Sequence, residues 1–219
     1  MHTFDKDYWE DHWGEGASAR PEDLAEPVSP YLVEQTRHLA PGTALDAGCG
    51  TGAEAVWLAS QGWLVTGADI SSAALDSARQ RGHRAGAAGR LSWVEADLTT
   101  WEPPQQYDLV SSHYAHATIP QLQLYQRLAQ WVAAEGVMII VGHLHQSDGD
   151  HEERHASEHG SAHALQHPDE ATVTADEIAA TFDATRWRIE YCEEVAREVA
   201  VHGERRTLHD AVVVAVRLR

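Results

Sequence analysis

Short apolar runs alternate along this chain with stretches in which apolar residues recur every three or four positions. The runs have strand length, and the longer stretches have the period of a helix with one buried face. One strand is predicted to begin at Ala44. Further strands are predicted over 63–70, 91–98, 107–113 and 137–142. Helices are predicted over 31–39, 53–61, 72–81 and 121–134. Strands that alternate with helices predict an α/β fold, a doubly wound sheet with helices on both faces.

The two ends of the chain complete this single predicted domain of residues 1–219. Aromatic residues at helical spacing in 4–13 predict an amphipathic helix, part of an N-terminal lid and helix region over 1–40. Thr174 followed by Glu177 predicts a helix that starts with a capping box. Residues 187–195 and 208–218 are predicted to form an antiparallel strand pair. A histidine-rich loop insertion is predicted over 143–168.

The stretch 44–52, ALDAGCGTG, is the one around which the prediction is organised. Glycines at alternate positions allow a tight turn and a close approach of a ligand to the backbone. The helix that follows presents free N–H groups at its first turn, which suits a polar or anionic ligand group. The last glycine comes one residue too early for the dinucleotide pattern G-x-G-x-x-G, so an NAD-dependent oxidoreductase is disfavoured.

Residues 45–52 resemble motif I of the class I S-adenosylmethionine-dependent methyltransferases, whose form is close to hhDhGCGTG. The resemblance implies a Rossmann-like sheet of seven strands, mostly parallel with an antiparallel C-terminal strand. It also implies S-adenosylmethionine as cofactor and methyl transfer to a small-molecule acceptor. The order of segments and the small size loosely resemble tellurite-resistance and thiopurine methyltransferases, which does not define a substrate.

Two acids follow predicted strands where a nucleotide-binding sheet needs them. Asp69 comes about twenty residues after the glycines, the place of a carboxylate that binds ribose hydroxyls. The resemblance implies that Asp97 and its neighbour bind the adenine amino group, which needs an acceptor. Tyr8 and Trp13 could close the site from the N-terminal lid. The predicted cofactor-binding residues are Asp46, Gly48, Cys49, Gly50, Thr51, Gly52, Asp69, Ile70, Asp97, Leu98, Ser112 and Trp13.

Composition and charge limit the classes of binding partner that we expect. The net charge of −18 repels phosphate backbones, so we expect no nucleic-acid partner. There is no run of 18 or more apolar residues and no secretory signal, so we expect no membrane partner and a cytoplasmic location. A small-molecule acceptor is favoured, and the chain is expected to be a monomer or a homodimer.

The 15 histidines are the unusual part of the composition. His113 and His116 follow the fourth predicted strand, and His143 and His145 follow the fifth. Ligands of a doubly wound sheet bind outside the carboxyl ends of its strands, so both pairs should face the acceptor. His113 is the first candidate for a general base.

Two other functions remain open at this stage. His113, His143 and His145 could instead hold a divalent transition metal in a metal-assisted methyltransferase. A protein that senses S-adenosylmethionine or buffers metal without catalysis is the alternative outside enzymes.

Overall fold

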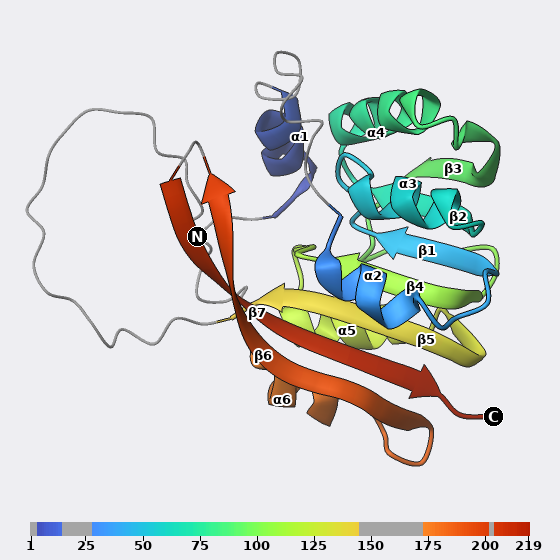
Figure 1. Ribbon diagram of the computed structural model, residues 1–219, viewed down its shortest axis with the longest axis vertical. Coiled ribbons are helices and arrows are strands. Elements are labelled where there is room, and N and C mark those ends of the chain that lie inside the picture. Colours follow the sequence, from blue (N-terminus) through green and yellow to red (C-terminus); the bar gives the residue numbers. More distant parts are fainter. Residues whose placement is uncertain (1–3, 15–27, 145–172, 202–203) are drawn as a thin grey trace, which may run out of the picture.

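The computed structural model describes residues 4–14, 28–144, 173–201 and 204–219, whose elements are labelled in Figure 1. The strands are β1 (Thr43–Ala47), β2 (Leu64–Asp69), β3 (Leu91–Glu95), β4 (Tyr107–His113), β5 (Val132–His143), β6 (Trp187–Val201) and β7 (Glu204–Arg217). The helices are α1 (Lys6–Gly14), α2 (Pro30–Thr36), α3 (Ala53–Ser60), α4 (Ser72–Arg84), α5 (Gln121–Ala129) and α6 (Ala175–Ala180), with a short 3₁₀ turn η2 (Ala88–Arg90). None of these helices combines the length and apolarity needed to cross a bilayer.

The strands form one seven-stranded sheet in the order β3-β2-β1-β4-β5-β7-β6. All pairs from β3 to β5 are parallel, and β7 runs antiparallel to both β5 and β6. The predicted Rossmann-like sheet with an antiparallel C-terminal strand is therefore confirmed. The chain leaves β1 toward β2 and β3 and returns to β4 on the other side of β1. That switch point, between the carboxyl ends of β1 and β4, is where such sheets bind ligands.

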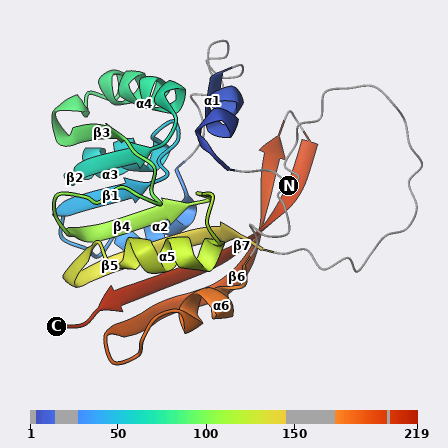
Figure 2. The ribbon, with the colours of Figure 1, turned by 180° about the vertical axis from the view of Figure 1, so that it is seen from behind.

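Both faces of the sheet are covered by helices, which explains why its central strands are almost wholly apolar. On one face α2 and α3 pack a core that includes Leu32, Leu58 and Ile139. On the other face α5 and α6 pack a core that includes Leu128 and Ile140. The two views from opposite sides show these layers in turn, α2 and α3 in Figure 1 and α5 and α6 in Figure 2.

Capping residues set the starts of two helices, and the second confirms the predicted capping box. Ser71 accepts a hydrogen bond from the Ala74 N–H at the start of α4. Thr174 and Glu177 form the reciprocal capping box at the start of α6. Each such cap satisfies backbone donors that have no partner inside the helix.

The helix predicted over 121–134 is wrong in its second half. α5 ends at Ala129, and β5 already begins at Val132, which pairs with Tyr107 of β4. Glu135 then adopts a positive φ of 64°, and the register shifts before the pairing resumes at Val137. Trp131 and Val132 have helical spacing with Leu128, but β4 provides partners for their backbone groups that a helix pattern cannot reveal.

Candidate cofactor and acceptor site

The glycine turn joins β1 to α3 at the switch point of the sheet. Gly48, Gly50 and Gly52 all have positive φ angles, of 75°, 48° and 78°. The Gly48 and Cys49 N–H groups donate to the Ala68 carbonyl of β2, at 2.8 and 3.1 Å. A Cβ on Gly48 would lie 2.4 Å from the Cβ of Ala115. The turn therefore needs glycine for its backbone angles and for the loop that packs against it after β4.

Asp69, at the end of β2, ties this turn to the neighbouring strand. Its Oδ2 accepts from the Gly50 N–H at 2.8 Å, and its Oδ1 accepts from the Ser71 N–H at 2.9 Å. Burial raises the pKa of Asp69, and the backbone N–H groups only partly offset that rise. Each carboxylate oxygen has a second lone pair. Asp69 can therefore support the turn and still accept a hydrogen bond from a hydroxyl of a ligand.

Asp46, near the end of β1, is a buried carboxylate with no ion pair among the described residues. Its Oδ1 accepts from Ser111 Oγ at 3.2 Å, and its Oδ2 has no hydrogen-bond partner among the described residues. Burial, and then the negative charge of Glu54, raise the pKa of Asp46 well above its usual range. A buried acid of this kind is costly unless something positive pairs with it.

The other predicted cofactor-binding residues lie in the turn itself or at the carboxyl ends of β2, β3 and β4. Cys49 and Leu98 are buried, and Ser112 is buried with a hydroxyl that has no hydrogen-bond partner among the described residues. Thr51 Oγ1 accepts from Arg81 at 3.1 Å. Ile70, half-buried, follows Asp69 directly. Asp97 Oδ1 accepts from the N–H and hydroxyl of Thr99, which shapes the loop after β3.

Helix α1 lies beside α4 (Figure 1) and contacts the glycine turn through Trp13. Trp13 packs against the turn, with its ring 3.3 Å from the position a Cβ on Gly50 would take. Glu10 accepts from the Ser72 N–H at 2.8 Å and from the Ser71 hydroxyl at 3.1 Å, so α1 caps the N-terminus of α4. Lys6 pairs with Glu95 at the end of β3. The aromatic N-terminal helix is thus placed where a lid would be needed.

Two of the strand-end histidines, His116 and His143, lie together. Their rings are stacked with centroids 5.7 Å apart, and the centroid of the Tyr114 ring lies 4.5 Å from that of His143. Both ring nitrogens of His113 lack a hydrogen-bond partner among the described residues, and burial lowers the pKa of His113. His145 and most of the predicted loop 143–168 lie outside the described residues.

The metal alternative gains no ligand set from the described part of the chain. Residues 4–14, 28–144, 173–201 and 204–219 contain no group of three or more His, Cys, Asp or Glu side chains placed to share an ion. His113 and His143, two of the three proposed ligands, lie within these ranges. The third, His145, does not, so the metal site stays a prediction.

Sequence reasoning missed a buried polar network beside the histidines. Asp210 of β7 has no exposed surface and accepts from Tyr114 at 2.8 Å, Tyr31 at 3.1 Å and Arg197 at 2.6 Å. Arg197 also donates to the Tyr114 hydroxyl at 2.9 Å. The available signal was a lone acid within the apolar run 208–218. This network fixes the wall of the site on the β7 side.

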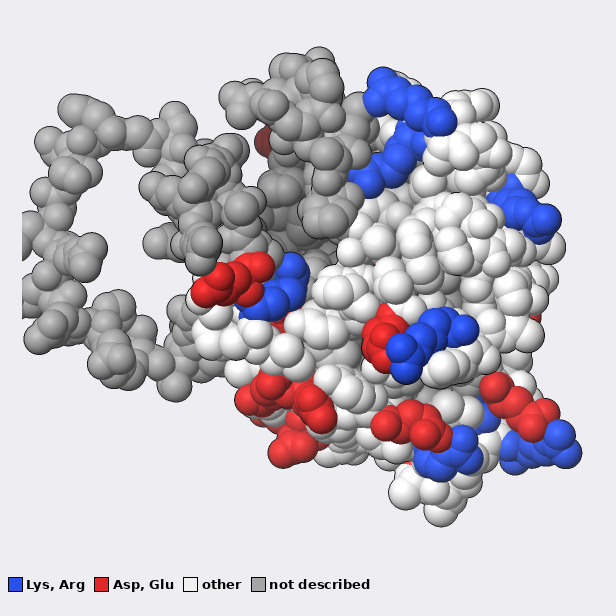
Figure 3. All heavy atoms as spheres, in the orientation of Figure 1, with Lys and Arg blue, Asp and Glu red and all other residues white. Residues whose placement is uncertain are grey.

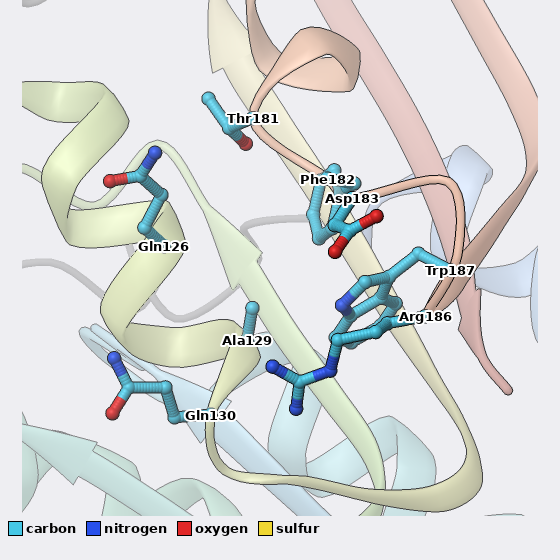
Figure 4. A pocket seen from close by; sticks show the side chains of 8 residues that line it. All are labelled: Gln126, Ala129, Gln130, Thr181, Phe182, Asp183, Arg186 and Trp187. Carbon is cyan, nitrogen blue, oxygen red and sulfur yellow. The ribbon is translucent and has the colours of Figure 1, made fainter. Parts of the chain in front are cut away.

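Two surface features lie apart from this site. On the face in Figure 3, acidic side chains lie beside basic ones in the lower half, whereas the described charged side chains at the upper right are basic. Figure 4 shows a hollow between the end of α5 and the 181–187 turn, lined by Phe182, Arg186 and Trp187 among others. Trp187 begins β6, so the hollow lies at the amino ends of the parallel strands. The glycine turn is at the opposite end.

The fold is a doubly wound sheet with a glycine turn at the end of β1, the place where such sheets bind nucleotide-like ligands. The family model described as a methyltransferase domain matches residues 44–136. Probable thiol methyltransferase 2 of Arabidopsis thaliana is 39% identical over 104 residues, 47% of this chain and 45% of the relative. Thiocyanate methyltransferase 1 of Brassica oleracea is 32% identical over 117 residues, 53% of this chain and 51% of the relative. The chain thus spans about half the length of the curated relatives it matches.

Two solved structures have a similar fold over most of the chain. TehB from Haemophilus influenzae has a TM-score of 0.67 at 15% identity, over 96% of this chain and 67% of the other. A structure solved for the conversion of a disulfide bond into a thioacetal group during echinomycin biosynthesis has a TM-score of 0.63 at 25% identity, over 92% and 85%. Residues 44–136 thus match a methyltransferase domain, and the chain resembles the class I S-adenosylmethionine-dependent methyltransferases.

Proposed function

We propose that this chain binds S-adenosylmethionine at the glycine turn and methylates a small thiol. The observation that carries the proposal is the set of buried polar atoms without partners around that turn: Asp46 Oδ2, Ser112 Oγ and the His113 ring nitrogens. Buried polar groups in a native protein need partners, which a bound ligand would provide. The proposal includes a single domain that acts in the cytoplasm as a monomer or homodimer.

The donors and charges of the site fit this cofactor. When bound, S-adenosylmethionine supplies an electrophilic methyl group on a positively charged sulfur. Asp46 would pair with its ammonium group and relieve the unpaired buried charge. Asp69 would accept hydrogen bonds from the ribose hydroxyls, and Asp97 would accept one from the adenine amino group. The Trp13 ring at the turn suits a neighbouring cation.

The thiol is proposed from the relatives and from the acceptor side of the site. Two curated relatives are described as thiol and thiocyanate methyltransferases. A neutral thiol must lose its proton when its sulfur is methylated, and a neutral imidazole at the end of β4 can accept it. Burial keeps the pKa of His113 low, so its ring is neutral at physiological pH. His113 and His116 are the candidates for this role.

The test is methyl transfer from radiolabelled S-adenosylmethionine to a panel of alkyl thiols, aryl thiols, phenols and amines. We expect labelled thioethers and little transfer to the phenols and amines. Binding of S-adenosylhomocysteine without turnover on any acceptor would favour the sensor alternative and contradict the enzyme proposal. Turnover with phenols or amines only would contradict the thiol assignment.

Glu10→Gln tests the lid. The carboxylate of Glu10 caps α4, and these hydrogen bonds from Ser72 outweigh burial and lower its pKa. Docking of α1 should therefore hold above the ordinary carboxyl pKa of 4.5 and be lost as pH falls through the lowered pKa. Loss of the charge should cost about 1 kcal/mol, or about five-fold in S-adenosylhomocysteine affinity. Calorimetry measures it, with Asp11→Asn on the exposed side of α1 as the control. Equal affinities of the two variants would contradict the lid role.

A further inference from the structure

His116 lies beside the glycine turn, in the loop that follows β4. It is 8% exposed and follows Ala115, the residue that packs against Gly48. Its ring is flanked by Phe4 at 5.1 Å and by His143 at 5.7 Å, both between centroids. His116 therefore lies between the N-terminal lid segment and the end of β5, beside the glycine turn.

Gln121, the first residue of α5, orients this ring. Its Nε2 donates to the Ala115 carbonyl at 2.9 Å, and its Oε1 lies 2.9 Å from His116 Nδ1. A carbonyl oxygen can only accept, so the amide nitrogen must be the atom that faces Ala115. The Ala115 carbonyl thus fixes which way the amide points.

The amide orientation determines the tautomer of His116. Because Oε1 is an acceptor, the Nδ1 atom that faces it must carry the proton. Nε2 then carries the lone pair of the neutral ring. His113 has no comparable neighbour, since neither of its ring nitrogens has a hydrogen-bond partner among the described residues.

We propose that Gln121 is a positioning residue that holds His116 in the Nδ1–H tautomer, and that His116 Nε2 takes the proton of the methyl acceptor. This inference rests on the proposed function and narrows its substrate class to thiols that are protonated at neutral pH. The S–H bond breaks with the proton going to Nε2, and the sulfur electron pair forms the new S–CH₃ bond. The electron pair of the old C–S bond remains on the departing S-adenosylhomocysteine. The imidazolium then releases its proton to water.

The tautomer can be measured without any substrate. Nitrogen-15 NMR of the histidine rings should show His116 protonated at Nδ1 in the wild-type protein, and His116→Asn assigns the signal. Gln121→Leu should move the proton toward Nε2, whereas Gln121→Glu, which still accepts from Nδ1, should keep it in place. Gln123→Leu, an exposed position on the same helix, is the control and should change nothing. A wild-type His116 protonated at Nε2 alone would overturn the inference.

Turnover with two thiols tests the base role. An alkyl thiol is protonated at neutral pH, whereas an electron-poor aryl thiol is already a thiolate and needs no base. His116→Asn should slow the alkyl thiol by about a hundred-fold or more and the aryl thiolate by less than about three-fold. Gln121→Leu should show the same selective loss at about ten-fold, and Gln121→Glu should restore most of it.

The outcomes separate the inference from the proposed function. If both thiols are methylated and His116→Asn slows them equally or not at all, the inference is wrong and the proposed function stands. If neither thiol is methylated while S-adenosylhomocysteine binds, the proposed acceptor class is wrong and the base role falls with it. If Gln121→Leu does not fold, the wild-type tautomer and the His116→Asn selectivity still decide the inference.

Discussion

Asp46→Asn should make the free protein more stable and its cofactor binding weaker. Burial and Glu54 raise the pKa of Asp46, so ionisation of this carboxyl lowers the stability of the folded chain. A raised carboxyl pKa contributes stability that is present below the ordinary value of 3.8 and lost as pH rises through the raised pKa. The neutral amide avoids that loss, by about 1 kcal/mol or about 2–4 °C in Tm.

The same substitution should weaken ligand binding, although it stabilises the free protein. Loss of a charged hydrogen bond to the ligand ammonium should cost about 1.5–3 kcal/mol, or about ten- to a hundred-fold in affinity. Thermal unfolding at several pH values measures the gain, which should vanish in acid. Calorimetry with S-adenosylmethionine measures the loss. Asp76→Asn, on the exposed face of α4, is the control and should change neither. A destabilised Asp46→Asn protein with unchanged affinity would contradict the account of the buried charge.

Gly48→Ala should have the larger effect on folding. The left-handed backbone at φ 75° costs a residue with a Cβ about 1–2 kcal/mol. The new methyl would also lie 2.4 Å from Ala115 Cβ, an overlap that costs about 1–3 kcal/mol more. The sum is about 2–5 kcal/mol, and relief of the overlap must shift the loop that carries His116. Cofactor affinity should therefore fall together with stability.

Two other glycines separate these contributions. Gly86 has a φ of 67° and no atom within 4 Å of an added Cβ, so Gly86→Ala should lose only the backbone part, about 1–2 kcal/mol. Gly89 has open space and an ordinary φ, so Gly89→Ala should be close to neutral. Urea unfolding of the three variants measures the differences. If Gly48→Ala costs no more than Gly86→Ala, the close contact of the turn with Ala115 is not important.

The sequence predicts the half of the site that is local in the chain. A glycine turn, an acid at the end of the next strand and the start of α4 depend on neighbours within a few residues or one strand. The sequence does not predict features that depend on contacts between residues far apart in the chain. β5 begins at Val132 because β4 offers hydrogen-bond partners there, and helical spacing cannot show that.

The acceptor side shows the same limit at the level of single atoms. The positions of His113 and His116 after β4 follow from topology, but the tautomer of His116 depends on the direction in which one amide points. The Asp210 network joins α2, β6, β7 and the residue that follows β4, which are far apart in the chain. Neither feature has a motif, because each depends on packed side chains rather than on spacing.

Titration calorimetry with S-adenosylhomocysteine tests the central claim most directly, on the full chain with and without prior chelation. We predict micromolar binding that Asp46→Asn weakens at least about ten-fold and Asp76→Asn leaves unchanged. Binding that disappears after chelation would support the metal alternative instead. No binding by the wild-type chain in either state, or equal affinities of the wild-type and Asp46→Asn proteins, would contradict the cofactor site described at the glycine turn.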